Sequence, residues 1–530
     1  MKQVNHWVWI FVRFFHLKYT EYEPMKLKIK PIGLAFLVLV LMNLPFYLAF
    51  RAGGEQYEFA GFLLNPIDGN SYLAKMQMGW AGAWKFDLLY SPVPGKGAYL
   101  FLFYIFLGRL ARWLHLSLII VFHAARILSS AILMLTLWKF FQWCFPEQPG
   151  DVYRAYSLAV VGGGLGWLSA ITGLGLTGDF WIAEAYPFLS MFVNPHFPLG
   201  LALILWVVSL SLRERPGNFW LAAGLAGVLG IVQPFGVAIA ALPMMAVALI
   251  EFPRVKWNVL LRNWGILLPG VAALGYQFFA IHSDPALALW NQENITLSPA
   301  LWDGMFSFAP AMILAIAGAV WAWRTNRLSM KVLTFWAVAG WILIYLPFSL
   351  QRRFMTGYYL PVTGLAVAGM TFAARNIPRL SRWGWPVIWF LSILTNLFIL
   401  FSFSTAIASH DASLYLSRDE VSALNWINGH VDPQAVVLAS PEMGLFIPAR
   451  TGRRVVYGHP FESVHAERSR KEVEAFYSGG LSSEAMTTFL RANHVAIILL
   501  GPREKKYGLK ELPGNFTLVD SVGNIQIYQP

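Results

Sequence analysis

The stretch "NPIDGNSYLAKMQMGWAGAW", Asn65 to Trp84, contains a carboxylate in surroundings where charge is scarce. After Asp68, large apolar side chains recur at helix-like spacings, which predicts a helix resting on a membrane surface. An ionised carboxylate at that surface could take a proton from an acceptor molecule as a general base. The alternative is structural, because Asp68 or Asn70 could be the N-cap residue that starts this helix.

Three basic side chains are candidate ligands for a phosphate. Lys96, in "SPVPGKGAYLFLFYIFLG", stands at a glycine-flanked turn before an apolar stretch. Arg352 and Arg353, in "QRRFMTGYYLPVTGLA", come just before another apolar segment, and guanidinium groups grip phosphate oxygens in a bidentate manner. For all three, the alternative role is to anchor a helix end at the membrane surface.

Glu184 and His196 are the notable ionisable groups of "GDFWIAEAYPFLSMFVNPHFPLG", together with Asp179 at its start. They could line a substrate pocket or hold a divalent metal such as Mg²⁺ or Mn²⁺, although a metal site prefers more oxygen or nitrogen ligands. The alternative is that "NPHFP" only turns the chain into the next apolar segment. The sequence contains no HExxH motif, no Ser-His-Asp arrangement and a single cysteine, Cys144.

The composition indicates which kind of protein must position these residues. The chain has 530 residues, of which 57% are hydrophobic and only 13% charged, with a mean hydropathy of +0.52. Because soluble proteins are about 25% charged, this composition predicts a polytopic membrane protein. The net charge of +12 is explained by Lys and Arg in cytoplasmic loops under the positive-inside rule, and we expect no nucleic-acid partner.

Apolar segments predict about eleven membrane spans. In 218–250 the sequence "QPFG" predicts two short helices with a break, and the stretch 98–112 is expected not to cross. With this parity most basic residues fall on the side of the N-terminus, so that side is predicted to be cytoplasmic. The C-terminus and the loops 51–97, 176–197, 281–304 and 349–357 are then outside. The predicted spans are 31–50, 117–140, 155–175, 198–212, 218–250 (two), 262–280, 305–323, 331–348, 358–374 and 384–405.

After about residue 412 the composition changes to amphipathic helical stretches alternating with short runs such as "AVVLAS", "AIILLG" and "NIQIYQP". This pattern predicts a small extracytoplasmic α/β domain. Within it, "TGRRVVYGHPFES" carries Arg453, Arg454, His459 and Glu462, which could shape an acceptor site or belong to a structural loop. The predicted organisation is an N-terminal cytoplasmic or interfacial segment, a transmembrane domain and this α/β domain, at 1–30, 31–411 and 412–530.

Several segments together resemble the GT-C superfamily of membrane glycosyltransferases, which includes protein O-mannosyltransferases and bacterial aminoarabinose transferases. The likeness covers roughly residues 30–405 in layout: a first span, a long outer loop with a carboxylate, interfacial helices and many further spans. "RRFMTGYYLPVTGLAVAG" is similar to the Arg-aromatic-Leu-Pro segment before a late span of the family. Many members have a paired acid in the first loop, whereas here Asp68 is followed by Gly69.

The resemblance implies a reaction at the outer face of the cytoplasmic membrane. A sugar would move, with inversion, from a polyprenyl-phosphate donor to a glycan, lipid or protein acceptor. Asp68 would be the base, Lys96 with Arg352 or Arg353 would hold the phosphate, and Glu184 and His196 would complete the pocket. Two alternatives stay open: a scaffold that binds a lipid-linked glycan without catalysis, and a transporter of a lipid-linked substrate.

Overall fold

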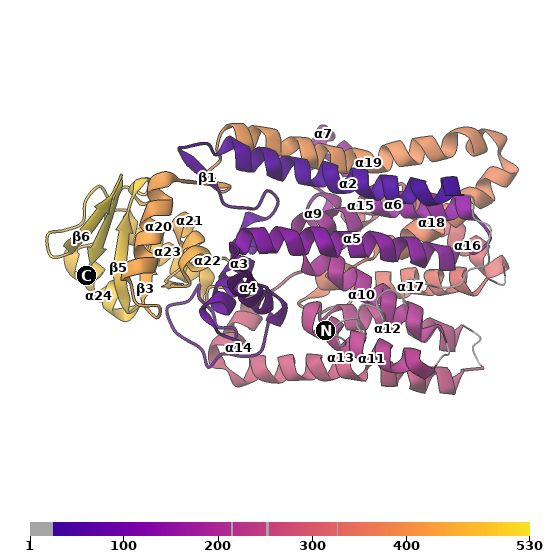
Figure 1. Cartoon of the computed structure of the whole chain (residues 1–530), viewed down its shortest axis with the longest axis horizontal. Helices are drawn as coiled ribbons and strands as arrows, with labels where there is room; N and C mark the ends of the chain where they lie inside the picture. Colours follow the sequence, from indigo (N-terminus) through magenta and orange to yellow (C-terminus); the bar gives the residue numbers. More distant parts are fainter. Residues whose placement is uncertain (1–24, 214–215, 251–253, 326) are drawn as a thin grey trace, which may run out of the picture.

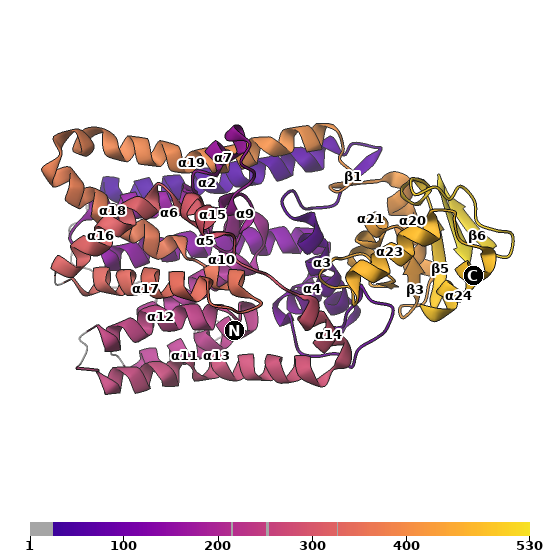
Figure 2. The same ribbon diagram turned by 180° about the vertical axis from the view of Figure 1, so that it is seen from behind.

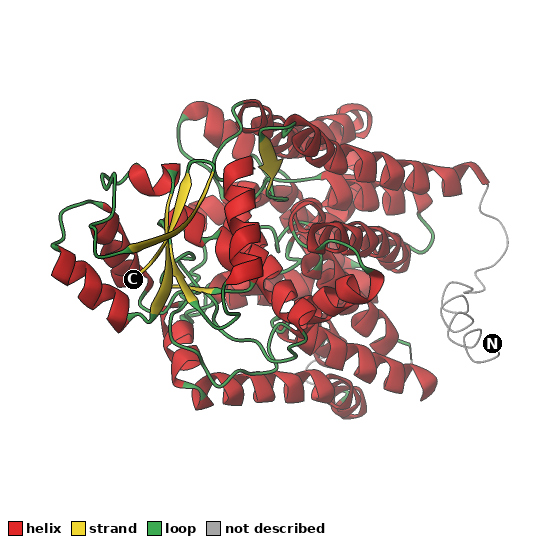
Figure 3. Ribbon diagram, turned by 60° about the vertical axis from the view of Figure 1, so that its left-hand side comes forward, coloured by secondary structure: helices red, strands yellow, loops and turns green. Residues whose placement is uncertain are grey.

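The computed structural model describes residues 25–213, 216–250, 254–325 and 327–530. A bundle of helices makes up most of the molecule, and a small sheet with its own helices lies at one end of the bundle (Figure 1). Nearly all strands belong to that sheet (Figure 3). Most of the N-terminal segment 1–30, predicted to be cytoplasmic or interfacial, lies outside the described residues, which begin at Met25.

The bundle helices follow the predicted spans. By length and composition, four described helices can cross a membrane, and six spans result if each of two bent helix pairs counts as one. The eleven expected spans all contain helix, while their exact number stays a prediction. The long helices are α2 (Met25–Ala52), α5 (Leu118–Cys144), α13 (Trp257–Ser283) and α19 (Pro378–Ala408). The bent pairs are α6 (Pro149–Val161) with α7 (Gly166–Thr172), and α15 (Leu301–Phe308) with α16 (Ala311–Arg324). The others are α10 (His196–Ser211), α11 (Pro216–Val232), α12 (Gly236–Leu249), α17 (Leu328–Ile344) and α18 (Tyr359–Asn376).

The break predicted within 218–250 is confirmed. α11 ends at Val232 and α12 begins at Gly236, with Gln233, Pro234 and Phe235 between them. Proline has no backbone N–H and its ring clashes with the preceding turn, so a continuous helix is disfavoured at this point. The Gln233 amide instead donates to the Thr356 hydroxyl at 3.2 Å, which ties the break to the segment that follows the two arginines.

The stretch 98–112 forms α4 (Leu102–Leu114), which packs along α3 (Pro66–Ala81) at the end of the bundle (Figure 1). Its 13 residues are too few for a span of about 20. A side chain at Gly79 of α3 or at Gly108 of α4 would collide with the backbone of the other helix, so the two helices touch through their backbones.

The start of α3 differs from the predicted N-cap. The helix begins at Pro66, and Asn65 is the N-cap, with its side chain accepting from the Asp68 backbone N–H. Proline suits the first helical position because its missing N–H has no intrahelical partner there. Asp68 therefore lies in the first turn of α3, and the expectation that Asp68 or Asn70 caps the helix is wrong.

The C-terminal part forms the predicted α/β arrangement. Its five-stranded sheet has the order β4-β3-β5-β7-β6, parallel between β3 and its neighbours and antiparallel from β5 onwards. The predicted strand runs become β3 (Val436–Leu438), β5 (Val495–Leu500) and β7 (Ile525–Gln529), beside β4 (Arg454–Val455) and β6 (Thr517–Val522). The helices are α20 (Arg418–His430), α21 (Pro441–Gly444), α22 (Phe446–Thr451), α23 (Ala466–Tyr477), α24 (Ser483–Ala492) and α25 (Pro502–Lys505).

The first loop and the C-terminal part are joined by a small separate sheet. β1 (Tyr57–Phe59) pairs antiparallel with β2 (Tyr415–Ser417), just after the last bundle helix. Seen from either side, α3, α4 and α14 (Pro285–Glu293) lie between the bundle and the C-terminal sheet (Figures 1 and 2). The segments predicted to be extracytoplasmic loops therefore meet at one end of the molecule.

Candidate active site

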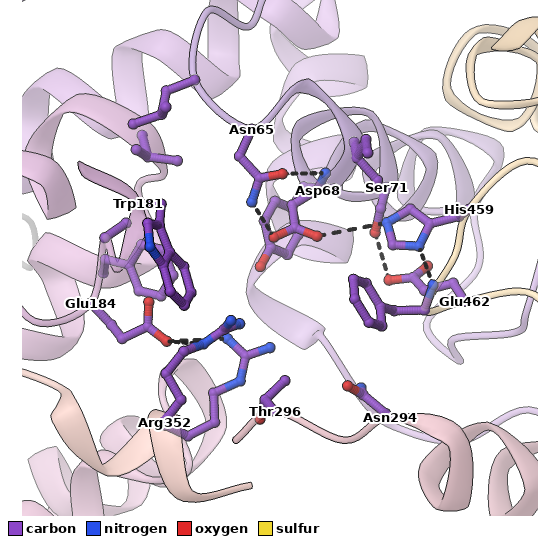
Figure 4. A pocket seen from close by; sticks show the side chains of 18 of the residues that line it. Asn65, Asp68, Ser71, Trp181, Glu184, Asn294, Thr296, Arg352, His459 and Glu462 are labelled. Atoms are coloured by element: carbon purple, nitrogen blue, oxygen red, sulfur yellow. Dashed lines mark hydrogen bonds and ion pairs between the residues drawn. The ribbon is translucent and has the colours of Figure 1, made fainter. Parts of the chain in front are cut away.

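A cavity of about 410 Å³ opens at this end, where five segments of the chain converge (Figure 4). Its walls come from the start of α3, the turn between α8 (Gly178–Trp181) and α9 (Pro187–Val193), the segment after α14, the helical turn η1 (Gln351–Met355) and the C-terminal turn 459–462. Four of the six predicted site residues line it: Asp68, Glu184, Arg352 and Arg353.

Asp68 points into the cavity with one donor at each carboxylate oxygen. The Asn65 amide donates to Oδ2 at 2.5 Å, and Nε2 of His459 lies 3.6 Å from Oδ1. Burial alone raises the pKa of Asp68, but the hydrogen bonding and charge of His459 and the charge of Arg353 outweigh it and lower the pKa to about 2. The carboxylate is therefore ionised at neutral pH and able to accept a proton.

Glu184, Arg352 and Arg353 form a loosely paired cluster on another wall. Arg352 Nε lies 3.8 Å and an Arg353 nitrogen 3.6 Å from the same oxygen, Oε1 of Glu184. Both Oε1 of Glu184 and Nε of Arg352 are buried and have no hydrogen-bond partner. Because buried polar atoms in proteins are normally satisfied, this cluster has unused capacity to bind a polar ligand.

Backbone hydrogen bonds join the loops that carry this cluster. The Gly357 N–H donates to the Glu184 carbonyl at 2.8 Å, and the Arg352 N–H donates to the Thr296 carbonyl at 3.1 Å. The Arg352 guanidinium also lies over the Trp181 ring, 5.1 Å from its centre. The arginines are thus held at the cavity wall by their own backbone and by an aromatic face.

The C-terminal turn contributes a second, tightly paired cluster. Lys75 Nζ donates to Glu462 Oε1 at 2.6 Å and to Ser71 Oγ at 2.5 Å, and Ser71 Oγ donates to the same Glu462 oxygen at 2.6 Å. The Lys75 side chain is only 1% exposed. Burial alone raises the pKa of Glu462, but the charges of Lys75 and His459 lower it below its ordinary value. A carboxylate from the C-terminal sheet domain is therefore locked onto α3.

Two predicted site residues lie away from the cavity lining. Lys96 is exposed, and its backbone N–H donates to the Asp284 carboxylate at 2.7 Å. Nδ1 of His196 is 2.6 Å from the Tyr104 hydroxyl, and its ring packs edge-on against Tyr72. His196 thus supports the aromatic side chains behind the cavity, and Lys96 belongs to a neighbouring loop.

These residues do not form a metal-binding set. Among the described residues, no three or more His, Cys, Asp and Glu side chains gather closely enough to hold a metal ion. The oxygens of Asp68 face an amide N–H and an imidazole nitrogen, and Glu184 faces two guanidinium groups. Divalent cations such as Mg²⁺ need several free oxygen ligands, which this arrangement does not offer.

Sequence reasoning missed part of the lining. Asn65 was passed over because the helix was expected to start later, and Trp181 because an aromatic residue near a membrane is usually an interfacial anchor. His459 and Glu462 were noted, but their role was left open between an acceptor site and a structural loop. Their placement depends on contacts with α3 across 387 and more residues, which no local pattern encodes.

Comparisons with known proteins give the fold. No family model and no curated protein matches the sequence. The archaeal oligosaccharyltransferase AglB from Archaeoglobus fulgidus, solved with an inhibitory peptide and a dolichol-phosphate, aligns with 89% of this chain and 69% of its own (11% identity, TM-score 0.53). Its complex with Zn and sulfate gives 12% identity and a TM-score of 0.50 over 88% of this chain and 67% of its own.

Arabinofuranosyltransferase AftD from Mycobacteria aligns with 93% of this chain, which spans 40% of AftD, at 12% identity and a TM-score of 0.54. The structures of AglB and AftD share their fold with this chain, which agrees with the layout that the sequence led us to expect. The described helices that are long and apolar enough to cross a membrane are consistent with that fold. Because one fold hosts different activities, the chemistry must be argued from the residues of the cavity.

Proposed function

We propose that this chain is a membrane glycosyltransferase that moves a sugar from a polyprenyl-phosphate donor to an acceptor hydroxyl. The observation that carries the proposal is one cavity lined by an ionised carboxylate, Asp68, and by two arginines, of which Arg352 has a buried donor without a hydrogen-bond partner. The GT-C fold of the chain agrees with it. AglB has been solved with a dolichol-phosphate, which belongs to the same class of lipid as the donor proposed here.

The reaction needs a base for the proton of the acceptor and positive charge for the departing phosphate, and the cavity provides both. The acceptor O–H loses its proton to the Asp68 carboxylate while its oxygen attacks the anomeric carbon of the sugar. The bond from that carbon to the phosphate oxygen breaks, and its electron pair leaves with the polyprenyl phosphate. A single displacement of this kind inverts the anomeric carbon, and Asp68 then returns the proton to water.

Arg352 and Arg353 are the proposed ligands of the departing phosphate. Guanidinium groups aimed at developing negative charge stabilise it most in a site that excludes water. Apolar side chains of Leu64, Ile67, Trp181, Val193 and Phe197 line the same cavity, and Ile67 and Trp181 are also partly exposed at its edge. A charged site beside an apolar rim suits a phosphate carried on a lipid chain. Lys96, exposed and outside the cavity, has no part in this proposal.

The chemistry is assigned to a single acid because position 69 has no room for a second. A side chain at Gly69 would collide with the Phe62 ring, so the paired acid of many GT-C members cannot be built here without moving that ring. Phosphate is a good leaving group, so no strong general acid is required beside the base. The absent second acid also favours the competing function, a scaffold that binds a lipid-linked glycan without turnover.

The proposed location is the cytoplasmic membrane, with the N-terminus inside and the cavity on the outer face. Basic residues flank the predicted spans on the side expected to be cytoplasmic, such as Arg324 at the end of α16 and Arg327 just before α17. The positive-inside rule places that side in the cytoplasm. The donor sugar and the acceptor would then meet at the outer surface.

The test is release of polyprenyl phosphate from a panel of polyprenyl-phosphate hexoses and pentoses, with the purified protein in lipid. We expect release by the wild type and a loss of about 10²–10⁴-fold in Asp68→Asn, the usual contribution of a general base. Asp432→Asn, at an exposed aspartate of the C-terminal domain, is the matched control and should keep wild-type activity. Donor binding without release by the wild type would favour the scaffold instead.

A further inference from the structure

The C-terminal turn "YGHPFES", Tyr457 to Ser463, reaches the candidate base from outside the helical bundle. His459 in this turn is 1% exposed, yet its Nε2 atom has no hydrogen-bond partner within the ordinary limit. The closest charged atom to that nitrogen is Oδ1 of Asp68, at 3.6 Å (Figure 4). A buried imidazole nitrogen aimed at a ligand cavity is an exception that needs an explanation.

The other ring nitrogen fixes which tautomer His459 adopts. The backbone N–H of Phe461 donates to Nδ1 of His459 at 3.0 Å, so Nδ1 carries no proton. A neutral imidazole has one protonated nitrogen, and here that nitrogen must be Nε2. The Nε2–H bond therefore faces Asp68 and can only donate. Nδ1 is thus occupied as the acceptor of the Phe461 N–H, and Nε2 is the nitrogen left to face the cavity.

The turn itself is anchored to the helix that carries Asp68. Asp68, Ser71 and Lys75 follow one another along one face of α3, and they meet His459 and Glu462 of the turn. On its other side the turn has no free space, because a side chain at Gly458 would collide with the Gly444 carbonyl. The Lys75–Glu462 pair thus sets the position of His459 relative to Asp68.

We propose that His459 is a positioning residue for Asp68, supplied by the C-terminal sheet domain and held in register by the Glu462–Lys75 pair. This inference rests on the proposed function, because it assigns His459 a part in the same reaction. His459 holds Oδ1 and Asn65 holds Oδ2, so the carboxylate keeps one orientation and each oxygen keeps a lone pair for the proton of the acceptor. Hydrogen bonds at catalytic groups are often long without a ligand and shorten when the site is filled, which fits the 3.6 Å separation.

Several charged or titratable groups face Asp68 besides His459. The test therefore changes His459 and leaves these other groups unchanged. They come from α3 and α4, the turn after α8, η1, the start of α10 and the C-terminal turn: Tyr72, Tyr104, Glu184, Arg352, Arg353, His196 and Glu462. Among these groups, His459 lowers the pKa of Asp68 the most. Removing it must raise the pKa of the carboxylate, so protonation of Asp68 moves to higher pH.

The experiment compares His459→Phe, which keeps a ring but has no donor, with His459→Gln, which keeps an N–H at similar reach. His430→Phe, at an exposed histidine of α20, is the matched control. We expect His459→Phe to lower the rate of polyprenyl-phosphate release by about ten- to a hundredfold, as for a misplaced catalytic group. The acid limb of its pH–rate profile should shift to higher pH, and His459→Gln should recover part of both effects.

A second readout does not depend on catalysis. The infrared band of a protonated carboxyl group should be missing in the wild type and present in His459→Phe at about pH 4, near the ordinary pKa of Asp. The band is assigned to Asp68 by its absence from the double variant of His459→Phe with Asp68→Asn. A loss of transfer with no shift of the acid limb or the band would overturn the positioning role, since a structural defect alone gives that result. If the carboxyl band appears in His459→Phe but the wild type transfers no sugar, the proposed function is wrong, and so is the role of His459 in catalysis. The contact between His459 and Asp68 would still be supported.

Discussion

Two clusters of opposite charges face the same cavity, and they differ in how completely their atoms are paired. In the Lys75–Ser71–Glu462 cluster, every hydrogen bond among the three side chains measures between 2.5 and 2.6 Å. In the Glu184–Arg352–Arg353 cluster the corresponding separations are 3.6 and 3.8 Å, and an atom of Glu184 and one of Arg352 have no hydrogen-bond partner. Both clusters are largely buried.

The difference separates a structural ion pair from a binding site. Three aromatic rings, of Tyr72, Phe86 and Phe101, surround the Lys75 ammonium at 4.4–5.4 Å from their centres, which leaves no approach for a ligand. The two arginines share a single carboxylate, so their cluster keeps a net positive charge next to the cavity. A phosphate would supply the missing acceptors, whereas the Lys75 cluster already has them.

The largest expected effect is on stability and concerns Lys75. Lys75→Met leaves Glu462 buried without its cation, and removing one partner of a buried pair costs about 3–5 kcal/mol. Lys471→Met is the matched control, because Lys471 and Glu467 are 2.7 Å apart but exposed at 71% and 84%, and exposed pairs contribute little to stability. Thermal unfolding in detergent should therefore shift strongly for Lys75→Met and little for Lys471→Met.

The double variant Lys75→Met with Glu462→Gln sharpens this prediction. With both charges removed, no unpaired carboxylate remains, so the double variant should be more stable than Lys75→Met alone. Equal unfolding midpoints for Lys75→Met and Lys471→Met would show that the buried pair does not hold the C-terminal turn against α3.

The second effect is on the reaction and concerns the arginines. Replacing both Arg352 and Arg353 by Gln should lower polyprenyl-phosphate release by about 10²–10³-fold or more, the loss expected for a single donor to a developing anion. Because this change alone would leave the buried Glu184 without a cation, Glu184→Gln is added to it so that no unpaired carboxylate remains and the fold is kept. Arg324→Gln, at an exposed arginine at the far end of α16, is the control. A fall in stability with unchanged release would reverse the assignment of the two clusters.

How much of this site could be predicted from the sequence depends on how far apart along the chain the contacting residues lie. Apolar segment lengths and basic loops predicted the helical bundle, the break in 218–250 and the gathering of outer loops at one end. That gathering brought Asp68, Glu184, Arg352 and Arg353 to one cavity, as the layout of the outer loops led us to expect. The predicted topology placed these four residues on one side of the membrane, because each stands in a loop expected to be outside.

Residues whose role depends on a specific distant partner were not predictable in the same way. Lys75 stands in an amphipathic helix, where a lysine usually extends its ammonium into water, but Glu462 and three rings enclose it. Lys96 has the chemistry of a phosphate ligand, yet the fold leaves it exposed beside Asp284. Residue type therefore indicated which groups could do chemistry. Only the three-dimensional contacts separated a structural lysine such as Lys75 from the arginines proposed to bind the phosphate.

The smallest expected effect is that of metal removal. The sequence left open whether Glu184 and His196 hold a divalent metal, but the oxygens of Asp68 face donors from Asn65 and His459, and Glu184 faces two guanidinium groups. Since positively charged groups already supply the stabilisation that a cation would give the departing phosphate, a chelator should leave the rate of release unchanged, and added Mg²⁺ or Mn²⁺ should not raise it. Loss of activity with the chelator and recovery with Mn²⁺ would mean that Asp68 turns from its two donors towards a cation. In that case His459→Phe would tighten metal binding instead of shifting the acid limb, so the same variant decides between a positioned base and a metal ligand.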